Sequence, residues 1–234
     1  MKYNLPLALA LLFFLTACAS NEIGHSKDVN PATIYTQYSI TRNKGEDSIR
    51  CRAQYRFAGQ NGTTLVLSQP AMVSLDEQQL TADSSEFEGA YYQQQFAAPS
   101  LKGTHYWFYK DINGKTFKEP FHLQLPICNT SFTDSIQPNN YTLSYQQLHT
   151  SVEITVQLSD SVGNDYSFTR KLSPQNNQLQ IEPAFFDSLA SGPVIISTYI
   201  NQIWPLQNCP AEGGTFSLYY FIQDWQLQLV RKTN

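Results

Sequence analysis

The chain of 234 residues holds few side chains of the kinds that do chemistry: four histidines, four cysteines and 19 acidic residues. Glu86 and Glu88 lie two residues apart in a strand-like stretch, so both would point to one face. A glycoside hydrolase needs two carboxyl groups about 5 to 9.5 Å apart. Glutamate is, however, an ordinary residue at the exposed positions of a strand, and the interpretation of Glu86 and Glu88 as such exposed residues is favoured.

No catalytic pattern supports an enzymatic reading. The sequence has no Gly-x-Ser-x-Gly, no His-Glu-x-x-His, no phosphate-binding glycine loop and no dinucleotide fingerprint. It has no Cys-x-x-Cys pair, and His25, His105, His122 and His149 have no partners at metal-ligand spacing. We therefore predict a non-enzymatic protein with no catalytic residue, metal or cofactor, although residues distant in sequence could still converge in the fold.

An aromatic run, Tyr106-Trp107-Phe108-Tyr109, is the most suggestive binding feature. In a strand, Tyr106 and Phe108 point to one face and Trp107 and Tyr109 to the other. One pair fills the core, and the other could stack on a sugar ring or contact a protein partner. Trp107 and Tyr109 are the candidate contact residues, and the alternative is that both pairs are covered.

The first eighteen residues form a secretory signal that ends in a cysteine. Lys2 gives a positive start, an apolar run follows from Leu5 to Leu15, and small residues lead into Cys18. The motif Leu15-Thr16-Ala17-Cys18 closely resembles the lipobox of bacterial lipoproteins. The resemblance implies cleavage before Cys18, attachment of diacylglycerol to its thiol and acylation, typically with palmitate, of its amino group. An ordinary secretory signal with a chance cysteine is the alternative.

Lipidation at Cys18 would make this residue an anchor. A single acyl chain binds a membrane reversibly, whereas two or three chains, at about 0.8 kcal/mol for each buried CH₂, hold a protein firmly. Ala19 and Ser20 follow the cysteine, where lipoproteins of the inner membrane usually carry aspartate. The resemblance thus implies a protein anchored in a bacterial envelope membrane, and specifically in the outer membrane of a Gram-negative source.

The other three cysteines are Cys51, Cys128 and Cys209, an odd number for an oxidising compartment. We predict a disulfide between Cys128 and Cys209, because both lie at the ends of elements in the second half of the chain. Cys51 lies on the apolar face of an alternating strand and is expected to be a small buried hydrophobic residue.

Composition favours an exported β protein. Only 15% of the residues are charged, and the chain has 14 Tyr and 14 Phe. The formal net charge of −4 argues against nucleic acid as a partner. The expected partners are the membrane, through the lipid, and an envelope protein or a glycan.

Alternation of apolar and polar residues predicts strands along most of the chain. Residues 49–57 should bury Ile49, Cys51, Ala53, Tyr55 and Phe57, and residues 151–158 should bury Val152, Ile154, Val156 and Leu158. Asn113-Gly114 is the strongest hairpin signal. Pro183 to Leu189 reads as a short helical turn.

The pattern from Val73 to Phe121 resembles the second half of bacterial immunoglobulin-like domains: a strand, a corner with glycine, an aromatic strand, a hairpin and a last strand. A similar order recurs in the second half. The fold class that we predict is all-β, with two tandem immunoglobulin-like antiparallel β-sandwich domains, and a single large sandwich is the alternative. The predicted segments are a signal peptide at 1–17, a lipidated N-terminus and flexible tether at 18–31, and sandwiches at 32–126 and 127–234.

Three functions follow from these observations. The favoured one is a non-enzymatic, membrane-anchored scaffold or protein-interaction module. A glycan-binding module is the second and requires an exposed aromatic platform. A hydrolase of envelope polymers is the third and requires a cleft with convergent carboxylates or histidine.

Overall fold

The computed structural model describes residues 22–231, so the predicted signal peptide and Cys18 lie outside the described residues. This part of the chain consists of strands, loops and short 3-10 turns, with no α-helix, which confirms the all-β class. No helix within residues 22–231 is long and apolar enough to cross a membrane. The turns are η2 (Ser26–Asp28), η3 (Pro31–Thr33), η4 (Ala98–Leu101) and η5 (Pro183–Phe186).

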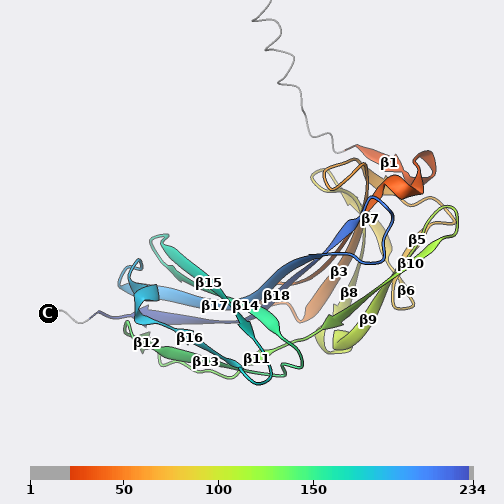
Figure 1. Ribbon diagram of the computed structural model, residues 1–234. Coiled ribbons are helices and arrows are strands. Elements are labelled where there is room, and N and C mark those ends of the chain that lie inside the picture. Colours follow the sequence, from red (N-terminus) through yellow and green to blue (C-terminus); the bar gives the residue numbers. More distant parts are fainter. Residues whose placement is uncertain (1–21, 232–234) are drawn as a thin grey trace, which may run out of the picture.

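The molecule is bent, with two lobes that meet at an angle (Figure 1). One eleven-stranded sheet runs along the inner side of the bend through both lobes, in the order β1-β4-β3-β2-β18-β17-β14-β15 with β7, β8 and β12 attached beside this path. A four-stranded sheet, β10-β9-β5-β6, covers it in the first lobe, and a three-stranded sheet, β11-β13-β16, covers it in the second. Each lobe is therefore a sandwich of two sheets.

The first lobe takes most of its strands from the first half of the chain. They are β1 (Ile23–His25), β2 (Ile34–Arg42), β3 (Ser48–Phe57), β4 (Thr64–Val66), β5 (Met72–Leu75), β6 (Gln78–Gln79), β7 (Thr81–Ser85), β8 (Gly89–Ala97), β9 (Gly103–Lys110) and β10 (Thr116–Leu123). The second lobe contains β11 (Ile127–Cys128), β12 (Ser135–Ile136), β13 (Tyr141–Gln146), β14 (Val152–Asp160), β15 (Asp165–Leu172) and β16 (Gln178–Ile181).

A long hairpin of β17 (Gly192–Pro205) and β18 (Gly214–Leu229) belongs to both lobes. Near its loop, β18 pairs in parallel with β2 over residues 214–220. Toward its open end, β17 pairs with β14 over residues 194–199. The register of the hairpin shifts between Thr198 and Tyr199, where it passes from one lobe to the other. The structure therefore does not confirm two separate tandem domains, because strands from the predicted second sandwich complete the first.

The core of the first lobe follows the predicted alternation in β3. Ile49, Cys51, Ala53 and Tyr55 are all fully buried, as predicted, and Cys51 is a free buried thiol. Phe57 was expected on the same face, but it lies at the end of the strand and is 41% exposed.

The prediction that Trp107 and Tyr109 contact a ligand or partner is wrong. Both side chains are fully buried between the two sheets of the first lobe. Trp107 stacks on Tyr38 with the ring centroids 4.5 Å apart, and Tyr109 packs at the same distance against Tyr55. These partners come from the eleven-stranded sheet, which fixes this face of β9 as the inner one.

The second lobe also follows the sequence pattern. Val152, Ile154, Val156 and Leu158 of β14 are buried, as predicted. The predicted turn at Pro183 is the 3-10 turn η5, and it places Phe185 and Phe186 in the core.

Two local predictions have opposite outcomes. The hairpin at Asn113-Gly114 is confirmed: it joins β9 to β10, and Asp111 Oδ1 accepts hydrogen bonds at 2.9 Å from the backbone N–H groups of Asn113 and Lys115.

The prediction of a flexible tether is wrong for its described part, because β1 pairs in parallel with β4 and the fully buried Ser26 accepts a hydrogen bond from the backbone of Ser68. A short polar segment without periodicity gave no sign of this pairing.

The predicted disulfide between Cys128 and Cys209 is absent, and both thiols are free. Cys128 lies in β11 of the second lobe, opposite Tyr145. Cys209 lies in the loop between β17 and β18, where the neighbouring Asn208 donates its backbone N–H to Glu119 of β10 at 2.7 Å. The long hairpin carries Cys209 back to the first lobe, away from the segment that its sequence position suggested. Burial raises the pKa of both thiols.

Candidate functional site

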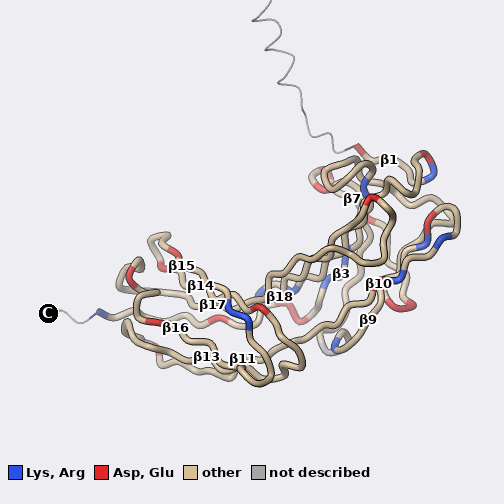
Figure 2. Tube along the Cα trace, in the orientation of Figure 1, with Lys and Arg blue, Asp and Glu red and all other residues tan. Residues whose placement is uncertain are grey.

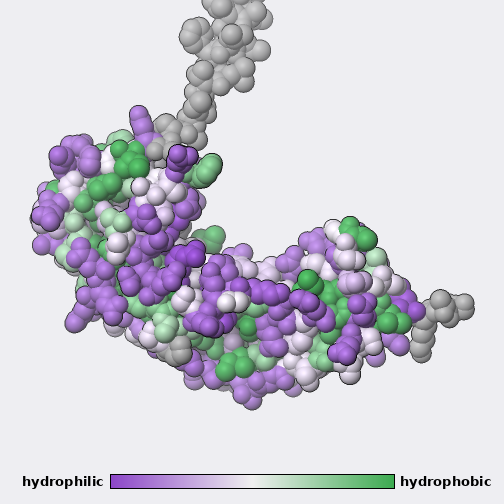
Figure 3. Space-filling view, turned by 180° about the vertical axis from the view of Figure 1, so that it is seen from behind, coloured by the Kyte–Doolittle hydropathy of each residue, from purple (hydrophilic) through white to green (hydrophobic). Residues whose placement is uncertain are grey.

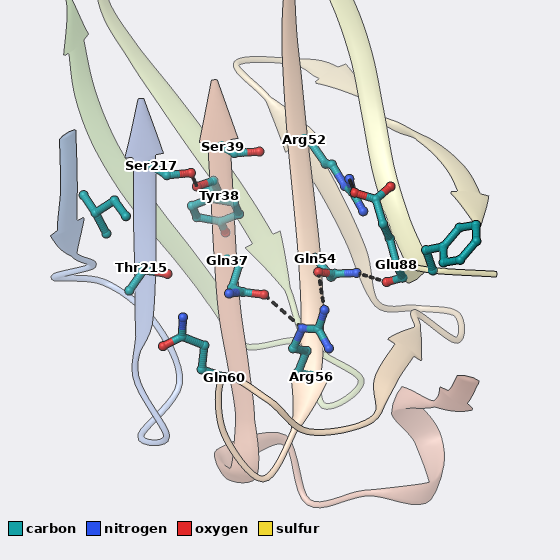
Figure 4. A pocket seen from close by; sticks show the side chains of 12 residues that line it. Gln37, Tyr38, Ser39, Arg52, Gln54, Arg56, Gln60, Glu88, Thr215 and Ser217 are labelled. Carbon is teal, nitrogen blue, oxygen red and sulfur yellow. Dashed lines mark hydrogen bonds and ion pairs between the residues drawn. The ribbon is translucent and has the colours of Figure 1, made fainter. Parts of the chain in front are cut away.

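A polar pocket opens on the solvent-facing side of the eleven-stranded sheet in the first lobe, opposite the side that packs on the four-stranded sheet (Figure 4). Its volume is about 350 Å³. Strands β2, β3 and β18 form its floor, and the β3–β4 loop and the β7–β8 turn contribute to its rim. We call it the Arg56 pocket, after the guanidinium in its floor.

Strand alternation explains why polar side chains gather there. The buried residues of β2 and β3 face the core, so the residues between them face outward. The strand register aligns outward side chains in rows across the sheet: Gln54 lies beside Gln37 and Gln37 beside Thr215. A second row is formed by Arg52, Ser39, Ser217 and Ile203.

Arg56 is held in place by three acceptors, all of them neutral. Its Nε donates to Gln37 Oε1 at 3.0 Å, and its two terminal nitrogens donate to Gln54 Oε1 at 2.9 Å and to the backbone oxygen of Gly62 at 3.0 Å. Gln54 is itself fixed, because its Nε2 donates to the backbone oxygens of Glu88 and Ala90. Figure 4 shows this chain of side chains across the floor.

The charge of Arg56 has no carboxylate partner within ion-pair distance in the described part of the chain. Arg52, the other arginine of the pocket, is paired with Glu88 at 2.7 Å and covers the ring of Tyr91 at 3.7 Å. Burial, and then the charge of Arg52, lower the pKa of Arg56. Among the described residues, the positive charge of Arg56 is thus not balanced by a carboxylate. Figure 2 shows the basic positions along β3.

Glycine at position 62 allows the close approach that positions Arg56. A Cβ atom there would lie 1.6 Å from the backbone oxygen of Phe57. The rim on the opposite side depends on Gly89, which has a φ of +69° and would place a Cβ 2.2 Å from Thr64 Oγ1. Both loops at the rim therefore have backbones that only glycine permits.

Two exposed apolar side chains border the polar floor. Phe87, in the β7–β8 turn, is 89% exposed, and Ile203, on β17, is 71% exposed. The register places Ile203 three strands away from Arg52, or about 14 Å at the usual strand spacing. On the face seen in Figure 3, hydrophobic residues form small separate patches over both lobes.

The aromatic run does present one pair outward, on the other side of the lobe. Tyr106 and Phe108 are half-buried on the outer face of the four-stranded sheet. Lys118 covers them, with its Nζ 3.9 Å from the Tyr106 ring and 5.2 Å from the Phe108 ring.

The acidic and histidine residues considered from the sequence do not converge. Glu86 and Glu88 flank Phe87 in the β7–β8 turn, and Glu88 is the one carboxylate among the described residues that line the pocket. His105 Nδ1 lies 2.8 Å from Asp76, on the other sheet. Within residues 22–231, no group of three or more His, Cys, Asp or Glu side chains could hold a metal ion.

The fold and the pocket define an all-β sandwich protein with a polar surface site. No protein-family model and no curated protein matches the sequence. Among solved structures, dimeric latent PorU from Porphyromonas gingivalis is 12% identical, with a TM-score of 0.29 over 85% of this chain and 21% of that one.

Two further structures show similar weak likeness. The Yersinia pseudotuberculosis adhesin InvE is 14% identical, with a TM-score of 0.23 over 83% of this chain and 60% of that one. The Bacteroides ovatus protein SGBP-B, solved with a mixed-linkage heptasaccharide, is 10% identical, with a TM-score of 0.20 over 89% of this chain and 65% of that one. The chain thus spans between about a fifth and two thirds of these proteins, and at such TM-scores the likenesses carry no argument about function.

Proposed function

We propose that the protein is a non-enzymatic binding module of a bacterial envelope that holds a glycan in the Arg56 pocket and is anchored by lipid at Cys18. The binding site is argued from the geometry of the pocket. The anchor rests on the sequence Leu15-Thr16-Ala17-Cys18 alone.

The observation that carries the glycan proposal is the combination of a polar floor with an exposed ring at its edge. Gln37, Ser39 and Ser217 offer amide and hydroxyl groups to the pocket, and these groups match the hydroxyls of a sugar. The exposed ring of Phe87 offers an apolar face against which the C–H groups of a pyranose can pack. In this proposal, Phe87 and the polar floor make the sugar contacts that the aromatic run predicted for Trp107 and Tyr109.

A second candidate is an extended peptide from a protein partner. Residues 200–205 of β17 form an open edge: β14 pairs only with residues 194–199, and no other described strand pairs with this stretch on that side. Such an edge can accept a further strand. The glycan proposal is favoured because polar side chains of three strands converge in the pocket, whereas a strand added at this edge would be held chiefly by backbone hydrogen bonds.

Glycan binding can be tested with the full chain in detergent on an array of neutral and acidic oligosaccharides. Phe87→Ala should weaken binding by about tenfold through loss of ring contact. Tyr106→Ala is the matched control, because it removes an aromatic ring from the opposite sheet. If no oligosaccharide binds, or if both variants bind as the unchanged protein does, the glycan proposal fails. Peptide binding that is lost in Ile203→Lys would support the second candidate.

The anchor has its own test. Cells that express the protein and are fed radiolabelled palmitate should label it, and Cys18→Ser should abolish both the label and sedimentation with membranes. A labelled Cys18→Ser protein would contradict the proposed lipid site.

A further inference from the structure

We infer that the glycan bound in the pocket is acidic and that a carboxylate on one of its sugars binds the guanidinium of Arg56. This inference rests on the proposed glycan-binding function and names the class of ligand. It is argued from the charge, the free donors and the preorganisation of Arg56.

Among residues 22–231, no carboxylate lies within ion-pair distance of the Arg56 guanidinium. A half-buried guanidinium is usually paired with an anion, because removal of a charge from water is costly. Here all three acceptors are neutral amide or backbone oxygens. Glu88 is the one acidic residue among the described residues that line the pocket, and its carboxylate is already bound to Arg52.

Arg56 also has hydrogen-bond donors that no described residue accepts. A guanidinium has five N–H groups, and three of them are accounted for by Gln37, Gln54 and Gly62. The two that remain lie on the two terminal nitrogens, since Nε has a single hydrogen and donates it to Gln37. Terminal guanidinium nitrogens can bind the two oxygens of one carboxylate.

The surroundings of Arg56 favour recognition of an anion. Its side chain is fixed before binding by Gln37 and Gln54, so little freedom is lost when a ligand binds. Partial burial strengthens its attraction for an anion, and an anion would offset both effects that lower the pKa of this group. A sugar chain that contacts Phe87 would bring its substituents over this floor.

The test compares acidic oligosaccharides with forms of the same shape that carry no charge. The probes are hexamers of galacturonate, glucuronate and mannuronate, each as the free acid and as the methyl ester, together with neutral hexoses, all titrated calorimetrically into the full chain in detergent. At least one free acid should bind about tenfold to a hundredfold more tightly than its ester, as expected for a charge-assisted hydrogen-bonded pair. This comparison needs no variant, so it is independent of any effect of a substitution on folding.

A charge-matched pair of variants completes the test. Arg56→Gln should bind the free acid and the ester equally, whereas Arg50→Gln on the same strand should keep the preference for the free acid. Arg50 is paired with Glu46 and is not part of the pocket lining. Equal affinity for acid and ester, or neutral hexoses as the tightest ligands, would overturn the inference and leave the glycan proposal standing. If no glycan binds at all, the proposed function itself fails.

Discussion

Substitution of Trp107 separates a core role from a binding role. The side chain is fully buried and stacks in parallel on Tyr38, with 2° between the ring planes. Replacement of a buried tryptophan by alanine removes this contact and leaves a cavity, which typically costs about 3–5 kcal/mol. That is a large part of the 5–15 kcal/mol by which a protein is ordinarily stable. We therefore expect Trp107→Ala to be strongly destabilised.

Trp107→Phe should cost much less than Trp107→Ala. Phenylalanine keeps a ring between the two sheets, and it removes the buried indole N–H, which has no acceptor among the described residues. An unpaired buried donor costs about 1–3 kcal/mol, so its removal offsets part of the lost packing. The expected net loss is below about 1.5 kcal/mol.

Urea unfolding followed by fluorescence and circular dichroism measures both effects. The matched control is Tyr106→Ala, because Tyr106 directly precedes Trp107 on the same strand, points outward and contacts Lys118. It should lose about 1 kcal/mol or less. If Tyr106→Ala were more destabilising than Trp107→Ala, or if Trp107→Ala remained stable and lost glycan binding, the assignment of the inner face of β9 would be wrong.

Three further outcomes are expected. Glu119→Gln should lose about 2–4 kcal/mol in urea unfolding and expose the β17–β18 loop to protease, because the buried Glu119 carboxylate accepts hydrogen bonds from the backbone of Gln207 and Asn208. The hydrogen bond from the backbone N–H of Ala190 is the main cause that lowers the pKa of Asp160 to about 2. The ionised carboxylate therefore stabilises the folded protein fully above about pH 4, and this contribution is lost as the pH falls through 2. The free energies of unfolding of the unchanged protein and of Asp160→Asn should converge near pH 2. Cys51 and Cys128 are buried, and burial raises the pKa of both thiols. Iodoacetamide at pH 7 should therefore label these two only after unfolding, as mass spectrometry can measure, and rapid labelling of either in the native protein would contradict this.

Local strand patterns were predictable because their cause is local. In β14, apolar residues at every second position mark one buried face, whatever strand lies beside it. The partner of a strand is not encoded in this way. Nothing in the sequence near Thr36 indicates that it pairs with Gly214 from the far end of the chain. The division at residue 126 was an inference from order along the chain, and it missed this pairing.

The candidate site was hidden for the same reason. Arg52, Gln54 and Arg56 follow the alternation of β3, and their polar spacing looks like any solvated face of a strand. The site exists because Phe87 and Thr215 reach the same surface from distant segments. Within the aromatic run, alternation separated the two pairs correctly, but only the facing residues of the other sheet decide which pair is buried. The burial of Trp107 could therefore not be decided from its own strand.

The shared hairpin makes the pocket dependent on both halves of the chain. Strand β18 supplies Thr215 and Ser217 to the pocket, and further along it supplies Leu227 and Leu229 to the core of the second lobe. A fragment that ends at residue 126 would lack β18, so β2 would lose its parallel partner over residues 36–42. Such a fragment should therefore fail to fold as a compact unit and should bind no glycan, with near-random amide chemical shifts as the readout. A well-dispersed spectrum from this fragment would show that the first lobe is an independent domain and that the hairpin only docks onto it.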